Sequence, residues 1–141
     1  MEFFVWKSSY LWTSLILVIN ILSRETGAQA SGKECINHTP IGMATGTIAD
    51  ADITASSVLN SDSHAKFARL GKSKGWIAND GDKHPWMQVN LHTTMNIIAI
   101  ATQGVVFRSK QYFIKSYYLS YGDDGKNWVN YPIQGMTKVS L

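Results

Sequence analysis

Short strand patterns separated by turn residues are the feature that most constrains how this chain can fold. Apolar and polar residues alternate from Trp86 to Leu91, which is typical of a strand with one buried face. The run from Ile97 to Ala101 is apolar throughout and is typical of a strand covered on both faces. Several short strands at this spacing, without a sustained helical pattern, predict an all-β sandwich or barrel.

A further strand pair is expected toward the C-terminus. Alternation returns between Phe113 and Tyr121. The pair Asp124-Gly125 then offers a hairpin turn, because glycine tolerates the positive φ that such turns need. The return strand is predicted over residues 128–131.

The N-terminus has the pattern of a secretory signal peptide. Lys7 precedes an apolar run from Tyr10 to Leu22, and Ala28-Gln29-Ala30 is a small-x-small cleavage site. The run covers about 13 residues, whereas a membrane-spanning helix needs about 20, so a retained anchor is the weaker alternative. We therefore predict a signal peptide over residues 1–30, a short tail over 31–34 and one domain over 35–141. The protein is then secreted and extracellular, with no transmembrane span in the mature chain.

The single cysteine, Cys35, lies near the start of the predicted mature chain. A lone thiol in an oxidising compartment lacks the usual disulfide partner. It bonds to another chain, stays free, or bonds to a cysteine beyond Leu141. Asn37 opens an N-glycosylation sequon, which agrees with export.

The charge balance is mildly basic, with a formal net charge of +3. A dense Lys/Arg tract is missing from the sequence, so nucleic acid is not expected as a partner. A small basic run contains Lys66, Lys72 and Lys74, which form either a patch for an anionic ligand or an ordinary solvated face.

The sequence carries no pattern of an enzyme or a metal protein. It contains no Gly-x-Ser-x-Gly elbow, His-Glu-x-x-His motif or phosphate-binding glycine loop. Its four histidines lack the spacing of zinc ligands. Asp50 and Asp52 are weak calcium candidates, because a calcium site takes several loop oxygens and no calcium-loop motif is present. We predict a non-catalytic protein without a cofactor.

Motifs along the chain resemble the discoidin domain family, also called the coagulation factor V/VIII C-type or F5/8 type C domain. The resemblance spans residues 35 to about 135 and implies a jelly-roll-like β-sandwich of the galactose-binding-like group. The residues that carry it are Cys35, Pro40 to Met43, Ile53 to Ser57, Ala68-Arg69-Leu70, Gly75-Trp76, Asn79-Asp80, Trp86 to Leu91, Thr102-Gln103-Gly104 and Tyr121 to Trp128.

The resemblance ends before the family's last strands and before the cysteine expected to bond with Cys35. It therefore implies a domain that is C-terminally incomplete, with that partner lying beyond the last residue. A missing disulfide costs about 2 to 5 kcal/mol in a small secreted domain. The resemblance also suggests that Arg69 forms a buried ion pair, with Asp80 as the expected partner. Core packing is the expected role of Trp76, Trp86 and Trp128.

The resemblance implies that ligands bind at one end of the sandwich, in two loops over residues 58–62 and 105–110. Apolar loop tips would enter a membrane while basic side chains hold anionic headgroups. The alternative is that Val106 and Phe107 pack inward as loop anchors. The candidate binding residues are Val58, Leu59, Asn60, Val105, Val106, Phe107, Arg108 and Lys110.

These features predict a secreted recognition or cell-adhesion module that binds a cell-surface or matrix ligand. The ligand classes are anionic phospholipid, carbohydrate, including galactose-type glycans, and a protein receptor. The alternative is an incomplete fragment or splice product that has no binding activity of its own, or a subunit that pairs with another chain through Cys35.

Overall fold

The computed structural model describes residues 3–7, 20–23, 39–95, 97–131 and 139–140. This part of the chain is built from short strands with three single-turn 3-10 helices, which confirms the all-β prediction. The predicted cleavage site, Cys35 and Asn37 lie outside the described residues. The helices are η1 Asp50–Asp52, η2 Ser61–Ser63 and η3 Ala65–Phe67. The strands are β1 Phe3–Lys7, β2 Asn20–Ser23, β3 Thr39–Pro40, β4 Ile53–Ala55, β5 Trp86–Asn90, β6 Ile97–Ala101, β7 Val105–Phe107, β8 Lys110–Tyr112, β9 Ser116–Gly122, β10 Val129–Asn130 and β11 Val139–Ser140.

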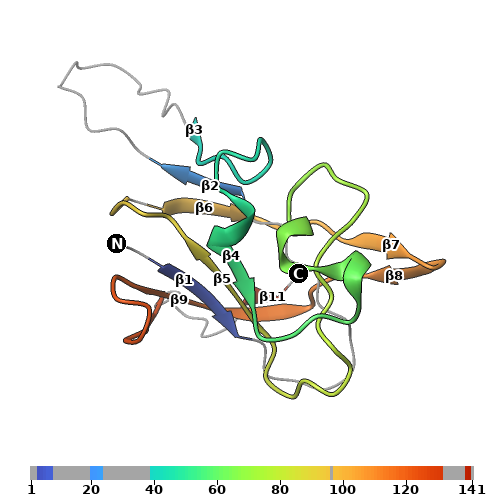
Figure 1. The fold of residues 1–141 in the computed structure, drawn as a ribbon. Coiled ribbons are helices and arrows are strands. Elements are labelled where there is room, and N and C mark those ends of the chain that lie inside the picture. The colour runs from blue at the N-terminus through green and yellow to red at the C-terminus, as the bar shows by residue number, and fades with distance from the viewer. Residues whose placement is uncertain (1–2, 8–19, 24–38, 96, 132–138, 141) are drawn as a thin grey trace.

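The strands form one main sheet and two smaller ones. The main sheet has the order β10-β9-β1-β5-β4, and β11 pairs with β9. A second sheet has the order β3-β2-β6, while β7 and β8 form a separate hairpin. This hairpin projects to the right in Figure 1, away from the N-terminal strand. The main sheet thus carries the scaffold, and the hairpin forms one end of the molecule.

The core lies against the apolar face of β5. Met87 and Val89 are fully buried and Leu91 is nearly so, as their alternation with Gln88 and Asn90 predicts. Each such side chain contributes about 1.5 to 3 kcal/mol of burial free energy. Trp76 is also fully buried, which confirms its predicted role in the core.

Two other burial predictions hold only in part. Trp86 and Trp128 are half-buried, so core packing accounts for only part of each side chain. Ala101 is exposed at the end of β6, so the expected cover on both faces of this strand was wrong at its last residue. The strand is covered nearer its start, where Ile97 packs against the main core.

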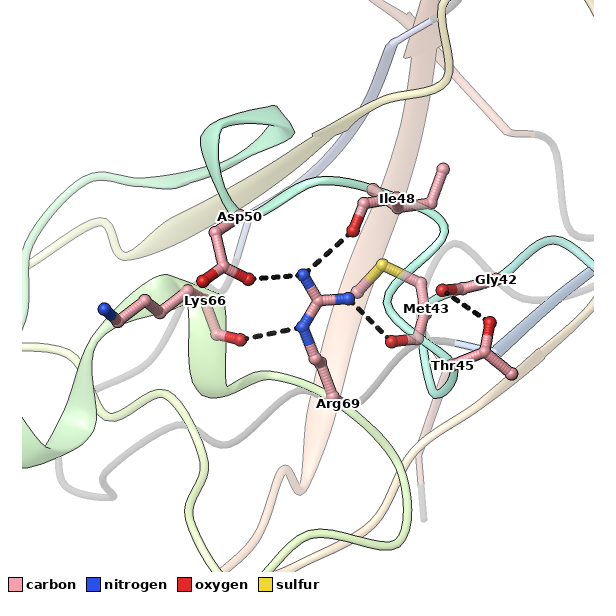
Figure 2. A network of polar contacts seen from close by, with 7 residues as sticks. All are labelled: Gly42, Met43, Thr45, Ile48, Asp50, Lys66 and Arg69. Carbon is pink, nitrogen blue, oxygen red and sulfur yellow. Dashed lines mark hydrogen bonds and ion pairs between the residues drawn. The ribbon is translucent and has the colours of Figure 1, made fainter.

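The buried side chain of Arg69 ties the segment 43–50 to η3 (Figure 2). Its Nη1 donates to the Met43 carbonyl at 2.8 Å and its Nη2 to the Ile48 carbonyl at 2.9 Å. Its Nε donates to the Lys66 carbonyl at 3.1 Å, and Nη2 forms an ion pair with Asp50 at 2.6 Å. The five-donor guanidinium suits this site because a buried cation needs several acceptors.

The expected pairing of Arg69 with Asp80 was therefore wrong, because Asp50 is the carboxylate in reach. Asp80 is exposed in a turn, whereas η1 brings Asp50 beside the guanidinium.

The predicted C-terminal hairpin is present. Val129 and Asn130 of β10 pair with Tyr121 and Ser120 of β9. In the turn, Asp124 Oδ1 accepts the backbone N–H groups of Lys126 and Asn127, and Gly125 has a φ of 69°. Gly125 therefore supplies the positive φ for which the turn was predicted at this position.

Candidate functional site

Ile77 supports both of the predicted binding loops. Its side chain is 1% exposed and forms a second apolar cluster apart from the main core. Five partly buried side chains pack against it: Leu59, Leu70, Val105, Phe107 and Tyr112. The loops 58–62 and 105–110 therefore meet over one side chain, and we call them the paired loops.

Backbone hydrogen bonds with Ile77 and the side chain of Asn60 hold the first of the paired loops. The Leu59 N–H donates to the Ile77 carbonyl at 2.8 Å, and the Ile77 N–H donates to the Ser63 carbonyl at 3.2 Å. Asn60 caps η2, where its Oδ1 accepts the Asp62 N–H at 2.9 Å. Because the Asn60 side chain serves this cap, its role in the structure is to shape the loop.

A partly buried polar network fixes the start of this loop, and sequence reasoning missed it. Asp82 Oδ2 accepts hydrogen bonds from the hydroxyls of Ser56 at 2.5 Å and Ser57 at 2.6 Å. Burial would raise the pKa of Asp82, but the hydrogen bonds from Ser56 and Ser57 hold it below its usual value. Trp76 Nε1 donates to the Ser57 carbonyl at 2.7 Å, so the network also fixes the core tryptophan. The adjacent hydroxyls Ser56-Ser57 were the available signal.

The second of the paired loops is a tight hairpin, which the sequence did not reveal. Arg108 and Ser109 link β7 to β8 with φ angles of 49° and 63°, the arrangement of a two-residue type I′ turn. Such turns usually contain Asn-Gly, and the pair Arg-Ser gives no such signal. The strands alternate, so Val105 and Phe107 pack on Ile77 while Val106 is 63% exposed.

Insertion of the apolar loop tips into a membrane would require Val58, Leu59, Val106 and Phe107 to be exposed, and three of them are not. Val58 is half-buried against the main core, and Leu59 and Phe107 are half-buried against Ile77. Val106 alone of the four is exposed. For Phe107 the alternative of an inward anchor holds, whereas for Val106 it does not.

Basic side chains surround the paired loops. Arg108 lies over the Phe107 ring, with 5.4 Å from Cζ to the ring centroid, and Lys110 is exposed on β8. Lys74 Nζ pairs with Asp62 at 2.8 Å. The hydrogen bond and charge of Lys74 lower the pKa of Asp62, and the charge of Arg108 lowers it further. Arg108 thus acts electrostatically on the other loop.

The predicted anionic patch lies beside the first of the paired loops. Lys66 and Lys74 approach the Phe67 ring, with Nζ at 5.5 Å and 5.0 Å from its centroid. All three lysines of the patch, Lys66, Lys72 and Lys74, are exposed. The ammonium groups of Lys66 and Lys74 thus lie over this ring, and that of Lys74 also pairs with Asp62.

The calcium candidates have protein partners. Asp50 pairs with Arg69, and Asp52 Oδ1 lies 2.6 Å from His92 Nε2. Within the described residues, no three or more His, Cys, Asp or Glu side chains gather as metal ligands would. The helices in this part of the chain are also too short or too polar to cross a bilayer.

The sequence of residues 52–140 matches the family model of the F5/8 type C domain. The match covers more than half of the chain, so this protein belongs to the F5/8 type C, or discoidin, family. Domains of this family are binding modules. The fold and the buried Arg69 and Trp76 agree with the family resemblance of the sequence.

Relatives with this domain are much longer proteins. The chain is 35% identical over 104 residues to EGF-like repeat and discoidin I-like domain-containing protein 3 of Mus musculus, covering 68% of this chain and 22% of that protein. It is 34% identical over 106 residues to coagulation factor VIII of Canis lupus familiaris, covering 71% and 4%. It is 33% identical over 103 residues to lactadherin of Sus scrofa, covering 67% and 25%. The chain thus spans a quarter or less of these relatives, and no solved structure matched it significantly.

Proposed function

We propose that this protein is a secreted, non-catalytic recognition module that binds anionic phospholipid surfaces through the paired loops. The observation that carries the proposal is the hairpin tip, where exposed Val106 stands beside Arg108 and Lys110. The neighbouring Phe107 is anchored on Ile77, so the tip is presented on a fixed support. The predicted signal peptide supports secretion.

The arrangement suits a membrane surface because it combines one apolar side chain with nearby cations. Val106 contributes about 1.5 kcal/mol on insertion, and Arg108 and Lys110 each contribute about 1 kcal/mol at an anionic leaflet. The sum of about 3.5 kcal/mol is offset by lost rigid-body freedom, so one site binds weakly. Stable attachment therefore needs several copies on one surface.

Co-sedimentation with vesicles tests the proposal. We expect the protein to sediment with vesicles that contain phosphatidylserine and to remain in solution with phosphatidylcholine alone. Val106→Asp should abolish sedimentation, because it puts an anion at the tip. Val129→Asp is the matched control, because Val129 is 54% exposed on the edge strand β10, outside the paired loops. Equal sedimentation of the two variants would contradict the proposal.

Charge-reversal variants test the contribution of the basic side chains to vesicle binding. Arg108→Glu should reduce sedimentation and its dependence on salt. Lys115→Glu, at another exposed position between β8 and β9, should change sedimentation little. If both variants lose binding to the same degree, net charge alone drives the association and the hairpin is not the site.

A further inference from the structure

Two lysines from different segments of the chain converge on one aromatic ring. Lys66 lies on η3 and Lys74 on the loop that follows it, and their Nζ atoms lie 5.5 Å and 5.0 Å from the centroid of the Phe67 ring. The two ammonium groups are therefore no further apart than the sum of these distances. Attraction to the ring offsets part of their mutual repulsion, so the fold holds two like charges close together.

Most of the positive charge at this place is left without a protein partner. Among the described residues, neither Lys66 nor Lys72 forms an ion pair. Lys74 pairs with Asp62, but both side chains are more than half exposed, so water competes for this contact. Three lysines against one carboxylate leave a local surplus of two positive charges, out of +3 for the whole chain. The net charge of the protein is therefore concentrated here.

The loop over residues 71–75, which carries two of these lysines, is anchored at its start. Leu70 packs against Ile77, the same side chain that supports the paired loops. The Gly71 N–H donates to Oε1 of Gln103 at 2.9 Å, and Gly71 has a φ of 72°, a conformation that favours glycine. The exposed cations are thus presented on a supported surface.

The surroundings of these lysines favour a chain of fixed anions over a lipid surface. No large apolar side chain is exposed within residues 60–75, so this surface has nothing to insert into a membrane. A polyanion needs only closely spaced cations. Single-stranded nucleic acid also needs aromatic faces that are open to bases, whereas the Phe67 ring is half-buried and approached by two ammonium groups. A sulfated polysaccharide meets these conditions, and the predicted export would expose the protein to it.

We propose that the patch of Lys66, Lys72 and Lys74 binds sulfated polysaccharides of the extracellular matrix, at a surface separate from the hairpin tip at Val106. The sulfate groups accept hydrogen bonds from the ammonium groups, and for Lys74 they replace Asp62 as the acceptor. Counterions are released when the two chains associate, so the affinity falls steeply with salt. This proposal does not depend on the lipid site.

Binding of the full chain to immobilised heparin, measured by surface plasmon resonance, tests the proposal. Lys66→Gln with Lys74→Gln, the double lysine variant, should weaken binding at least about tenfold, because each cation at an anionic surface contributes a factor of about five. Its matched control is Lys115→Gln with Lys126→Gln, which removes the same charge from two other exposed positions and should change the affinity less than about twofold. Desulfated heparin should bind none of these proteins.

A gain of affinity is also expected, which loss of folded protein cannot produce. Asp62→Asn removes the carboxylate that competes for Lys74, so it should raise the affinity for heparin by up to about fivefold. Asp123→Asn is the matched control, because Asp123 is exposed in the turn between β9 and β10. Equal affinities of these two variants would contradict the proposal.

Vesicle sedimentation separates this patch from the lipid site. Val106→Asp should no longer sediment with vesicles and should retain most of its binding to heparin. The double lysine variant should lose heparin binding and still sediment. If the wild type binds heparin but not vesicles, only the lipid site is contradicted.

Three other results would overturn the proposal of a polysaccharide site. The double lysine variant and its control could bind heparin equally, or desulfated heparin could bind as well as heparin. The double lysine variant could also lose vesicle binding alone, which would assign the patch to lipid headgroups.

Discussion

The environment of Arg69 and the paired loops use positive charge in opposite ways. Arg69 is buried and satisfied by three backbone carbonyls and Asp50, all within the protein. Around the paired loops, Arg108, Lys110 and Lys66 keep their charges exposed, and Lys74 pairs only at the surface with Asp62. A buried cation whose hydrogen bonds all go to protein acceptors stabilises the fold. An exposed cation on an anchored loop is available to bind a ligand.

The largest expected effect comes from removing the buried cation. Arg69→Ala leaves three carbonyls without a donor, and we expect a loss of about 3 kcal/mol in the free energy of unfolding. Asp50 is 60% exposed and can be hydrated, so it adds little to the loss. Urea denaturation at neutral pH measures the change. Arg69→Lys should recover less than half of it, because an ammonium group lacks the geometry to reach all the acceptors. Full recovery by lysine would contradict the assigned role.

Ile77→Ala tests the support of the paired loops. Truncating a fully buried isoleucine costs about 2 to 4 kcal/mol, and here the cavity lies directly beneath Leu59 and Phe107. We expect lower stability together with weaker vesicle binding. Val106→Ala should weaken vesicle binding with a change in stability within about 0.5 kcal/mol. If the Ile77→Ala variant is less stable but binds vesicles with the same affinity as the wild type, packing on Ile77 is not needed for binding.

Low pH should weaken the hydrogen bonds of Asp82 that hold the first of the paired loops. The pKa of Asp82 is lowered in the folded state, so its ionised form contributes stability that is present above the unfolded value of about 3.8 and is lost as pH falls through the folded pKa. Asp82→Ala should cost about 2 kcal/mol at pH 7, because Ser56 and Ser57 lose an acceptor. The difference in unfolding free energy between wild type and variant should shrink as the pH falls below about 4 in urea denaturation. If the difference in unfolding free energy stays constant as the pH falls, the ionised form of Asp82 does not stabilise the fold.

The smallest effect on stability is expected at the surface pair of Asp62 and Lys74. Asp62→Asn should leave the free energy of unfolding nearly unchanged, because both side chains are more than half exposed and solvent screens the pair. It removes an anion beside the paired loops, so vesicle binding should rise by up to about fivefold, the equivalent of one charge at the membrane. Unchanged binding at low salt would place the contact with the membrane elsewhere.

The strands that carry their own pattern could be predicted from sequence. The range Ile97–Ala101 matches β6, and the ranges predicted around residues 86–91 and 128–131 contain β5 and β10. In each case the alternation or the apolar run reflects burial, and burial is what holds the strand in place. The family could also be assigned, because the order of its motifs survives in the sequence.

Features that depend on distant partners could not be predicted. The partner of Arg69 is set by how η1 folds back, which spacing along the chain does not encode. The hairpin at Arg108-Ser109 lacks the residues that mark such turns. The position of β1 was missed because the segment has the pattern of an export signal, and that pattern and a strand both use apolar residues. The anchoring of Phe107 follows from Ile77, which is remote in sequence.

A single isoleucine beneath two recognition loops has a consequence for how such a domain can diversify. A mutation at Ile77 changes the surface on which both Leu59 and Phe107 pack, so it alters the shapes of the two loops together. New ligand preferences should therefore arise most readily at exposed positions such as Val106 and Lys110, where a substitution leaves the packing on Ile77 unchanged.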